Sequence, residues 1–253
     1  MELYEICFSP TGGTRKVADM LAGGLADESR FVDLTDSRAD FAGVSLDAED
    51  IAVIAVPSYG GRVPATATER LSALHGNGAR AVLACVYGNR AYEDTLVELE
   101  DAAKQAGFRV ISAVAAIAEH SIARQFAAGR PDSQDALRLG EFAARIRAKL
   151  LAGDAAEPAI PGNRPYKKAG GAGMVPKPTR ECVQCGACAK ACPVQAIDMN
   201  DAKKVDGSAC ISCMRCVAIC PHSARKVNGV MLAAVNVALK KVCSDRKEPE
   251  LYI

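Results

Sequence analysis

Eight of the 11 cysteines of this chain lie between residues 182 and 220, and this stretch constrains the fold more than any other. It contains CVQCGACAKACP and, after a short spacer, CISCMRCVAICP. Both runs have the spacing Cys-x2-Cys-x2-Cys-x3-Cys-Pro, which is typical of the ligands of [4Fe–4S] clusters. A metal-held module of this kind needs no large apolar core, so about 55 residues suffice for it.

The two cysteine runs form an internal repeat. Cys182, Cys185, Cys188, Cys192, Pro193 and Ala196 recur, each 28 positions later, at Cys210, Cys213, Cys216, Cys220, Pro221 and Ala224. In two-cluster proteins with this spacing, the fourth cysteine of a run ligates the other cluster. We therefore expect a first cluster on Cys182, Cys185, Cys188 and Cys220, and a second on Cys210, Cys213, Cys216 and Cys192, in a pseudo-two-fold module.

A zinc site and a disulfide scaffold are the alternative roles for so many cysteines. Zinc needs four ligands, usually as Cys-x2-4-Cys pairs, and fits fourfold runs followed by proline poorly. Disulfides need an oxidising compartment, whereas the acidic start MELYE gives no signal peptide. No apolar run approaches the ~20 residues of a membrane helix. We expect a cytoplasmic protein with no membrane segment.

Ahead of the cysteines, five apolar or β-branched segments alternate with helical patterns. The expected strands are residues 2–8, 31–34, 51–56, 81–86 and 110–117, and the last expected helix is 133–151. IAVIAV and AVLACV are apolar throughout, as parallel strands covered on both faces are. This order predicts a doubly wound α/β sheet, in which ligands bind beyond the carboxyl ends of the strands.

The loops after the first, third and fourth expected strands are rich in glycine, tyrosine and hydroxyl groups: SPTGGT, PSYGGRVP and YGNRAYED. SPTGGT joins a strand to a helix N-terminus, where free amides and the helix dipole favour a phosphate. It is neither a P-loop nor the Gly-x-Gly-x-x-Gly fingerprint. A plain turn with Thr14 capping the helix is the alternative.

As a set, these loops resemble the three FMN-binding loops of the flavodoxin family, and residues 1–230 resemble the flavodoxin–ferredoxin fusion proteins of anaerobic bacteria and archaea. The resemblance implies a five-stranded parallel sheet of order 2-1-3-4-5, followed by a small α+β two-cluster ferredoxin domain. It implies that Ser9, Thr11, Gly12, Gly13 and Thr14 hold the FMN phosphate. The flavin ring would lie between Ser58, Tyr59, Gly60 and Gly61 on one side and Tyr87, Gly88, Asn89 and Tyr92 on the other.

Two departures from the flavodoxin pattern concern the flavin. Many flavodoxins have Asn at the position of Gly13. The chain has no Trp, so a Trp/Tyr pair cannot enclose the ring. Either Tyr59, Tyr87 or Tyr92 stacks on it, or one face of the flavin is open.

Composition suggests where the units meet. We expect an FMN-binding domain at 1–152, a Gly/Pro/Ala-rich linker at 153–178, a ferredoxin domain at 179–229, and a C-terminal helix and tail at 230–253. Residues 1–153 carry 16 Lys and Arg against 21 Asp and Glu, a net charge of −5, and residues 154–253 carry 15 against 9, a net charge of +6. Opposite fields favour docking of a cluster on the Tyr59/Tyr92 side, within the chain or in a partner subunit.

The remaining reactive-looking residues receive ordinary roles. Cys7 and Cys85 lie among aliphatic residues and are expected to be buried thiols. Glu119, His120 and Ser121 are adjacent, and adjacent side chains cannot converge as a catalytic triad does. We assign no catalytic residue and expect this loop to border the flavin.

The expected function is electron transfer between FMN and two [4Fe–4S] clusters, which converts two-electron into one-electron chemistry for a partner oxidoreductase. The alternatives are a flavin-dependent reductase of a small substrate such as a quinone or disulfide, and a redox sensor. A deep pocket beside an open flavin face would favour the reductase. Neither half has the long basic stripe of a nucleic-acid binder, so the expected partner is a redox protein, and a homodimer is left open.

Overall fold

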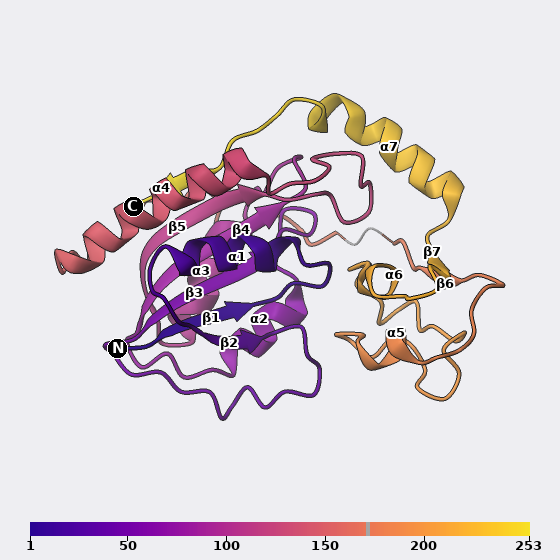
Figure 1. The fold of residues 1–253 in the computed structure, drawn as a ribbon, viewed down its shortest axis with the longest axis horizontal. Coiled ribbons are helices and arrows are strands. Elements are labelled where there is room, and N and C mark those ends of the chain that lie inside the picture. Colours follow the sequence, from indigo (N-terminus) through magenta and orange to yellow (C-terminus); the bar gives the residue numbers. More distant parts are fainter. Residues whose placement is uncertain (171–172) are drawn as a thin grey trace.

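A six-stranded sheet of order β2-β1-β3-β4-β5-β8 forms the centre of the N-terminal unit (Figure 1). The computed structural model describes residues 1–170 and 173–253. The strands are β1 (Leu3–Cys7), β2 (Arg30–Asp33), β3 (Ile51–Pro57), β4 (Arg80–Tyr87), β5 (Arg109–Ile117) and β8 (Glu250–Tyr252). The first five are parallel, which confirms the order 2-1-3-4-5. The C-terminal residues add β8 as an antiparallel edge strand on β5.

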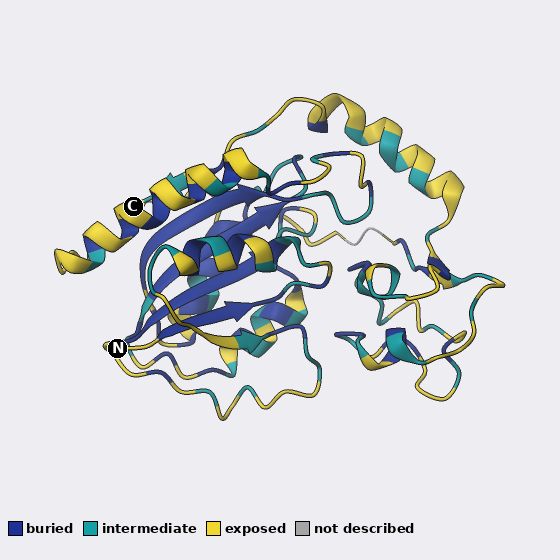
Figure 2. Cartoon of the chain, in the orientation of Figure 1, coloured by how far each residue is buried: buried dark blue, intermediate teal, exposed yellow. Residues whose placement is uncertain are grey.

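Helices cover both faces of this sheet. Helices α1 (Gly13–Gly23) and α4 (Ser133–Leu151) pack on one face, and α2 (Ala65–Ser72) and α3 (Thr95–Gln105) on the other. The central strands β1, β3, β4 and β5 are buried, as Figure 2 shows, whereas the edge strands β2 and β8 are partly exposed. Each buried Leu, Ile or Phe contributes about 1.5–3 kcal/mol, so the apolar strands and the helix stripes together specify this layered core.

Local sequence signals set the helix starts. Asp132 caps α4 by accepting hydrogen bonds from the amides of Gln134 and Asp135, and the Asp132 amide donates one to the Asp135 carboxylate. Helix α1 starts differently, after Gly12 with a φ of 90°, and this N-cap residue has no side chain to cap the helix. The start of α1 therefore leaves amide groups free at the carboxyl edge of the sheet.

The cysteine-rich module has short elements: α5 (Ala187–Lys190), α6 (Arg215–Ala218), and a two-stranded sheet of β6 (Lys177–Pro178) and β7 (Arg225–Lys226). Its two halves repeat in backbone conformation as well as in sequence. Positive φ angles occur at Gln184, Gly186 and Gln195 and again, 28 positions later, at Ser212, Met214 and Ser223. The sequence repeat is thus a structural repeat.

The stretch expected to be a linker is partly bound to α3. Asp94 accepts hydrogen bonds from the amides of Asn163 at 2.9 Å and Lys167 at 2.7 Å. Arg164 pairs with Asp101 at 2.7 Å. Residues 163–167 therefore form a strap on the N-terminal unit, and the segment free to span to the module is shorter than composition indicated.

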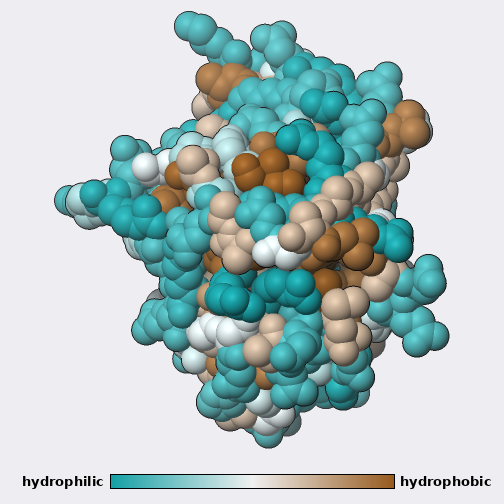
Figure 3. Space-filling view, turned by 90° about the vertical axis from the view of Figure 1, so that its left-hand side faces the viewer, coloured by the Kyte–Doolittle hydropathy of each residue, from teal (hydrophilic) through white to brown (hydrophobic). Residues whose placement is uncertain are grey.

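Helix α7 (Gly229–Cys243) runs from the module back to the N-terminal unit and leads into β8 (Figure 1). Val235, Leu239 and Cys243 form a stripe that packs on Ala123 and Phe126. No helix of residues 1–170 and 173–253 is long and apolar enough to cross a bilayer. The face in Figure 3 is mainly hydrophilic with small, separate hydrophobic patches.

Candidate functional site

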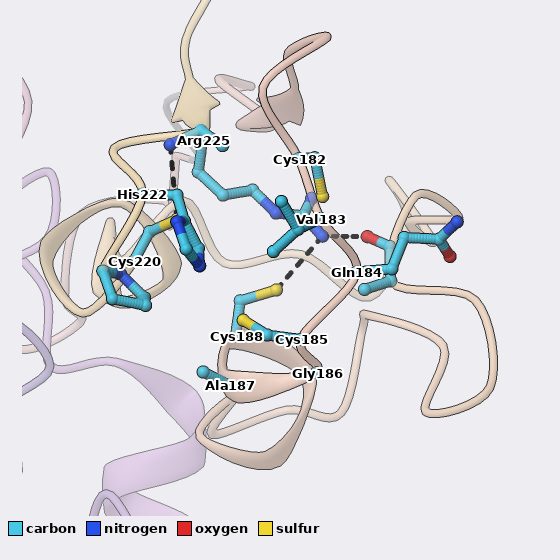
Figure 4. Close-up of a pocket in the computed structure, with 13 residues that line it drawn as sticks. Cys182, Val183, Gln184, Cys185, Gly186, Ala187, Cys188, Cys220, His222 and Arg225 are labelled. Carbon is cyan, nitrogen blue, oxygen red and sulfur yellow. Dashed lines mark hydrogen bonds between the residues drawn. The ribbon is translucent and has the colours of Figure 1, made fainter.

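Two small cavities in the module each gather four cysteines. Cys182, Cys185, Cys188 and Cys220 line the first, shown in Figure 4, and Cys192, Cys210, Cys213 and Cys216 line the second. In each cavity the fourth cysteine of one run lies with the first three of the other. These are the two sets that the ligand spacing predicts for a pair of cubanes.

The two sets of cysteines differ in exposure. Cys185 of the first set is exposed, whereas Cys192 and Cys213 of the second are buried. Burial raises the pKa of Cys213 to about 11 and that of Cys216 to about 12. Iron binds the thiolate, so cluster assembly must displace these protons. Among the described residues, no three Cys, His, Asp or Glu side chains converge to hold a single metal ion.

The SPTGGT loop has the geometry of an anion site. The Ser9 hydroxyl accepts a hydrogen bond from the amide of Arg15 at 2.9 Å, and the Ser9 amide donates to Thr35 Oγ1 at 2.7 Å, which fixes the loop. Within the described residues, the amides of 11–14 have no hydrogen-bond acceptor. Because Thr14 does not cap the helix, these amides fit a phosphate at the N-terminus of α1.

Gly13 has a packing reason for departing from the flavodoxin pattern. A Cβ built on Gly13 would lie 2.9 Å from the Cβ of Ala118, in the chain that follows β5. That contact is closer than side chains tolerate. The close approach of this segment therefore accounts for glycine here.

A cavity of about 650 Å³ lies between the N-terminal unit and the module. The predicted flavin loops contribute Ser58, Tyr59, Gly60 and Gly88 to its lining, the loop after β5 contributes His120, Ser121 and Ile122, and the module contributes Cys210, Ile211 and Ser212. Val235 and Leu239 of α7 complete it, and the lining includes no residue of 9–14. The predicted flavin loops and the second cysteine run thus face one cavity.

Four residues expected beside the flavin ring do not line this cavity. Gly61 packs instead against the Glu93 side chain. Tyr87 is buried against Tyr92, with ring centroids 5.3 Å apart, and the Tyr92 hydroxyl hydrogen-bonds to Tyr252 of β8 at 2.7 Å.

Asn89 also binds the C-terminal segment. Its Nδ2 donates to the carbonyls of Cys243 at 2.7 Å and Asp245 at 2.8 Å. These contacts engage Asn89 and Tyr92 with the C-terminal segment and Tyr87 with Tyr92, and their expected place beside the flavin stays a prediction. The cause is β8, whose pairing with β5 is not visible in the local sequence.

Of the three candidate stacking tyrosines, Tyr59 alone lines the cavity. Burial raises its pKa well above the usual range, and the nearby Cys213 thiol acts in the same direction. Tyr59 therefore lies where the flavin loops approach the second set of cysteines. This agrees with docking on the Tyr59 side, while Tyr92 takes no part in it.

His120 is a rigidly held, neutral donor at the same cavity. Its Nδ1 accepts hydrogen bonds from the amides of Ile122 at 3.2 Å and Ala123 at 3.1 Å, which assigns the ring proton to Nε2. Burial lowers the pKa of His120. A Cβ on Gly88 would lie 2.7 Å from His120 Cδ2, so glycine at 88 gives the ring its place. The neighbouring Glu119 pairs with Arg124 and forms no triad.

Contacts missed by the sequence reasoning join the module to the N-terminal unit. Arg70 of α2 donates to the carbonyls of Leu34, at 2.6 Å, and of Pro193. From the module, Arg215 Nη1 donates to the carbonyl of Pro10, at 3.3 Å, beside the anion loop. Ile211 packs against the core of the N-terminal unit.

Residues 181–224 match the family model for a 4Fe-4S dicluster domain. A comparison with curated proteins finds no match. Among solved structures, a flavodoxin from the domain Archaea is 11% identical over 60% of this chain and 99% of that chain, with a TM-score of 0.44. A Streptococcus pneumoniae flavodoxin is 22% identical over 58% and 99%, with a TM-score of 0.40.

The flavodiiron core from Synechocystis is 16% identical over 61% of this chain, with a TM-score of 0.43, and the chain spans only 37% of its length. The order of the sheet and the matched dicluster domain are the stronger findings. By these two, the chain joins an α/β unit with the flavodoxin-like strand order to a 4Fe-4S dicluster domain.

Proposed function

We propose that the protein is a cytoplasmic electron-transfer protein that binds FMN and two [4Fe–4S] clusters in one chain. The observation that supports this proposal is the cavity of about 650 Å³, which is lined by both the flavin loops and Cys210–Ser212. FMN can exchange two electrons on one side and single electrons on the other, and each cluster carries one. The chain would convert between the two chemistries for a partner redox protein.

The residues of the chain have separate tasks in this proposal. The free amides at 11–14 hold the FMN phosphate, and Tyr59 and His120 position the ring. Val235 and Leu239 of α7 shield the cavity from water. Arg70, through the carbonyl of Pro193, and Arg215, through that of Pro10, hold the module in place, so that electron transfer needs no large swing of the module.

Anaerobic purification tests the cofactor content. We expect about eight irons per chain and one FMN, read from metal analysis and the absorbance spectrum. Because the module is held on the N-terminal unit, reduction of the flavin through the clusters should change little with ionic strength in stopped flow. Zinc or about four irons would refute the cluster assignment, and a rate that falls steeply with salt would refute the held arrangement of the two parts.

A flavin-dependent reductase of a small substrate is the second candidate. The size of the cavity favours it, because small-molecule sites usually occupy about 300–1,000 Å³. Its discriminating test offers quinones and disulfides to the protein while an excess of chemical reductant keeps its clusters reduced, beside a control without protein. Multiple turnovers with a small acceptor would support the reductase, whereas oxidation by redox proteins alone would support the carrier.

A further inference from the structure

The internal repeat is broken at one buried position. Ile197 follows the first cysteine run, and 28 positions later its counterpart is Arg225. Both are buried, at 4% and 2% exposure. Ile197 lines the second cavity and Arg225 the first. The pseudo-symmetry thus places an alkyl group beside one set of cysteines and a guanidinium beside the other.

Arg225 contacts the first set directly. Its Nη2 donates to Cys188 Sγ at 3.3 Å (Figure 4). The same nitrogen donates to the carbonyl of Ala202, and Nη1 donates to the carbonyl of Pro176 at 3.4 Å. Its Nε is buried without a partner. None of these acceptors is a carboxylate.

Burying a cation without a counter-ion is costly. A cubane with its four thiolates carries a negative charge, about −2 when oxidised. The Arg225 guanidinium therefore has the counter-charge it needs when the first cavity holds a cluster.

Within the described residues, no side-chain donor contacts a sulfur of the second set. Arg215 lines the second cavity, and its Nη1 donates to the carbonyl of Pro10 at 3.3 Å. The second set is also less exposed, since the exposed cysteine, Cys185, belongs to the first. Hydrogen bonds to the sulfurs, local charge and solvent exposure set the potential of an iron–sulfur cluster. The hydrogen bond from Arg225 to Cys188 and the exposure of Cys185 favour added negative charge at the first site.

We infer that Arg225 makes the first cluster the easier of the two to reduce, so that a single electron in the module rests there. The step is a one-electron redistribution: the second cluster is oxidised, the first is reduced, and no bond or proton changes. The inference rests on the proposed cluster ligation. The first cluster, at the exposed side, would present the electron to a redox partner, and the second would connect it with the flavin cavity.

Redox titration of the anaerobic full-length protein tests this inference. Potentials come from voltammetry, and hyperfine-shifted NMR signals of the cysteine β-protons assign each step to a cluster. The variants are Arg225→Gln, which removes the charge, Arg225→Lys, which keeps it, and Arg225→Ile, which copies Ile197. Lys226→Gln is the matched control, because it removes one positive charge from the exposed neighbour on the same strand.

In the wild type, the electron should occupy the first cluster at least about tenfold more than the second, about 59 mV for a one-electron couple. Arg225→Gln and Arg225→Ile should lower this ratio about tenfold through the first cluster, while Arg225→Lys and Lys226→Gln leave it nearly unchanged. If Arg225→Ile loses iron, the comparison of Arg225→Gln with Arg225→Lys still tests the effect of the charge. Equal shifts at both clusters, no shift in Arg225→Gln, or the same shift in Lys226→Gln would overturn the inference. A wild type without eight irons would instead refute the proposed function.

Discussion

Replacing Asn89 with glycine should release the C-terminal end of α7 from the N-terminal unit. Asn89 is 3% exposed, and its Nδ2 donates to the carbonyls of Cys243 and Asp245 at 2.7 and 2.8 Å. The φ of Asn89 is 65°, a conformation that glycine adopts freely. The substitution therefore removes two hydrogen bonds without straining the backbone.

The size of the effect follows from the groups left behind. A buried carbonyl that loses its donor costs about 1–3 kcal/mol. Asp245 is exposed, so water can replace part of its lost bond, and we expect about 2–4 kcal/mol in total. Since about 1.4 kcal/mol is a factor of ten, the opening equilibrium of the C-terminal segment should rise about 30- to 700-fold.

Hydrogen exchange followed by mass spectrometry measures this opening. Peptides from residues 244–253 should lose protection in Asn89→Gly, and β5, which pairs with β8, should lose part of its own. The matched control is Asn228→Gly at the exposed N-cap of α7, where glycine costs only a few tenths of a kcal/mol. If protection were unchanged in Asn89→Gly, or lowered no more than in the control, the Asn89 hydrogen bonds would not hold the C-terminal segment.

Three further predictions concern the cofactor sites. Cys192→Ser should damage the second cluster and Cys220→Ser the first, each leaving about four of eight irons; equal damage to both clusters by either variant would contradict the crossed ligand sets. Thr11→Ala and Gly12→Val should each weaken FMN binding and leave the iron content unchanged, because the anion loop loses a hydroxyl or its open approach; unchanged flavin content in both would place the phosphate elsewhere. Burial lowers the pKa of His120, so the unfolded state binds more protons just below its ordinary pKa of about 6.5. The His120 contribution to stability should be complete above about pH 6.5 and be lost as the pH falls towards the lower pKa of the folded state. The urea midpoint of unfolding should therefore fall less between pH 7 and acidic pH in His120→Gln than in the wild type.

The sequence predicted what depends on local spacing. The crossed cysteine sets of the two cavities follow from a repeated motif whose ligand chemistry is specific. Apolar strand runs predicted the parallel sheet. Arg225 was also visible in the sequence, as the charged counterpart of Ile197 directly after the matching pair Ala196 and Ala224.

What the sequence could not predict depends on contacts between distant residues. Tyr92 reads as a flavin residue in its own loop, but its hydroxyl bonds to Tyr252, 160 positions away. The strap has no periodic pattern, because it is held by single contacts such as Arg164 to Asp101. From the sequence, Gly13 only lacks the side chain that Asn has in many flavodoxins. The close approach of Ala118, which leaves no room for a side chain there, is visible only in the structure.

The cysteine-rich module is held at both of its ends, and this changes what kind of fusion the chain is. The strap at 163–167 precedes it on α3, and β8 follows it on β5. In topology the module is an insertion into the N-terminal domain rather than an appendage. A single proteolytic cut between the strap and the module should therefore leave two fragments that stay associated through the sheet. Because both ends are anchored, the entropy lost in bringing the module onto the N-terminal unit is lost once, during folding, and not again at each electron transfer.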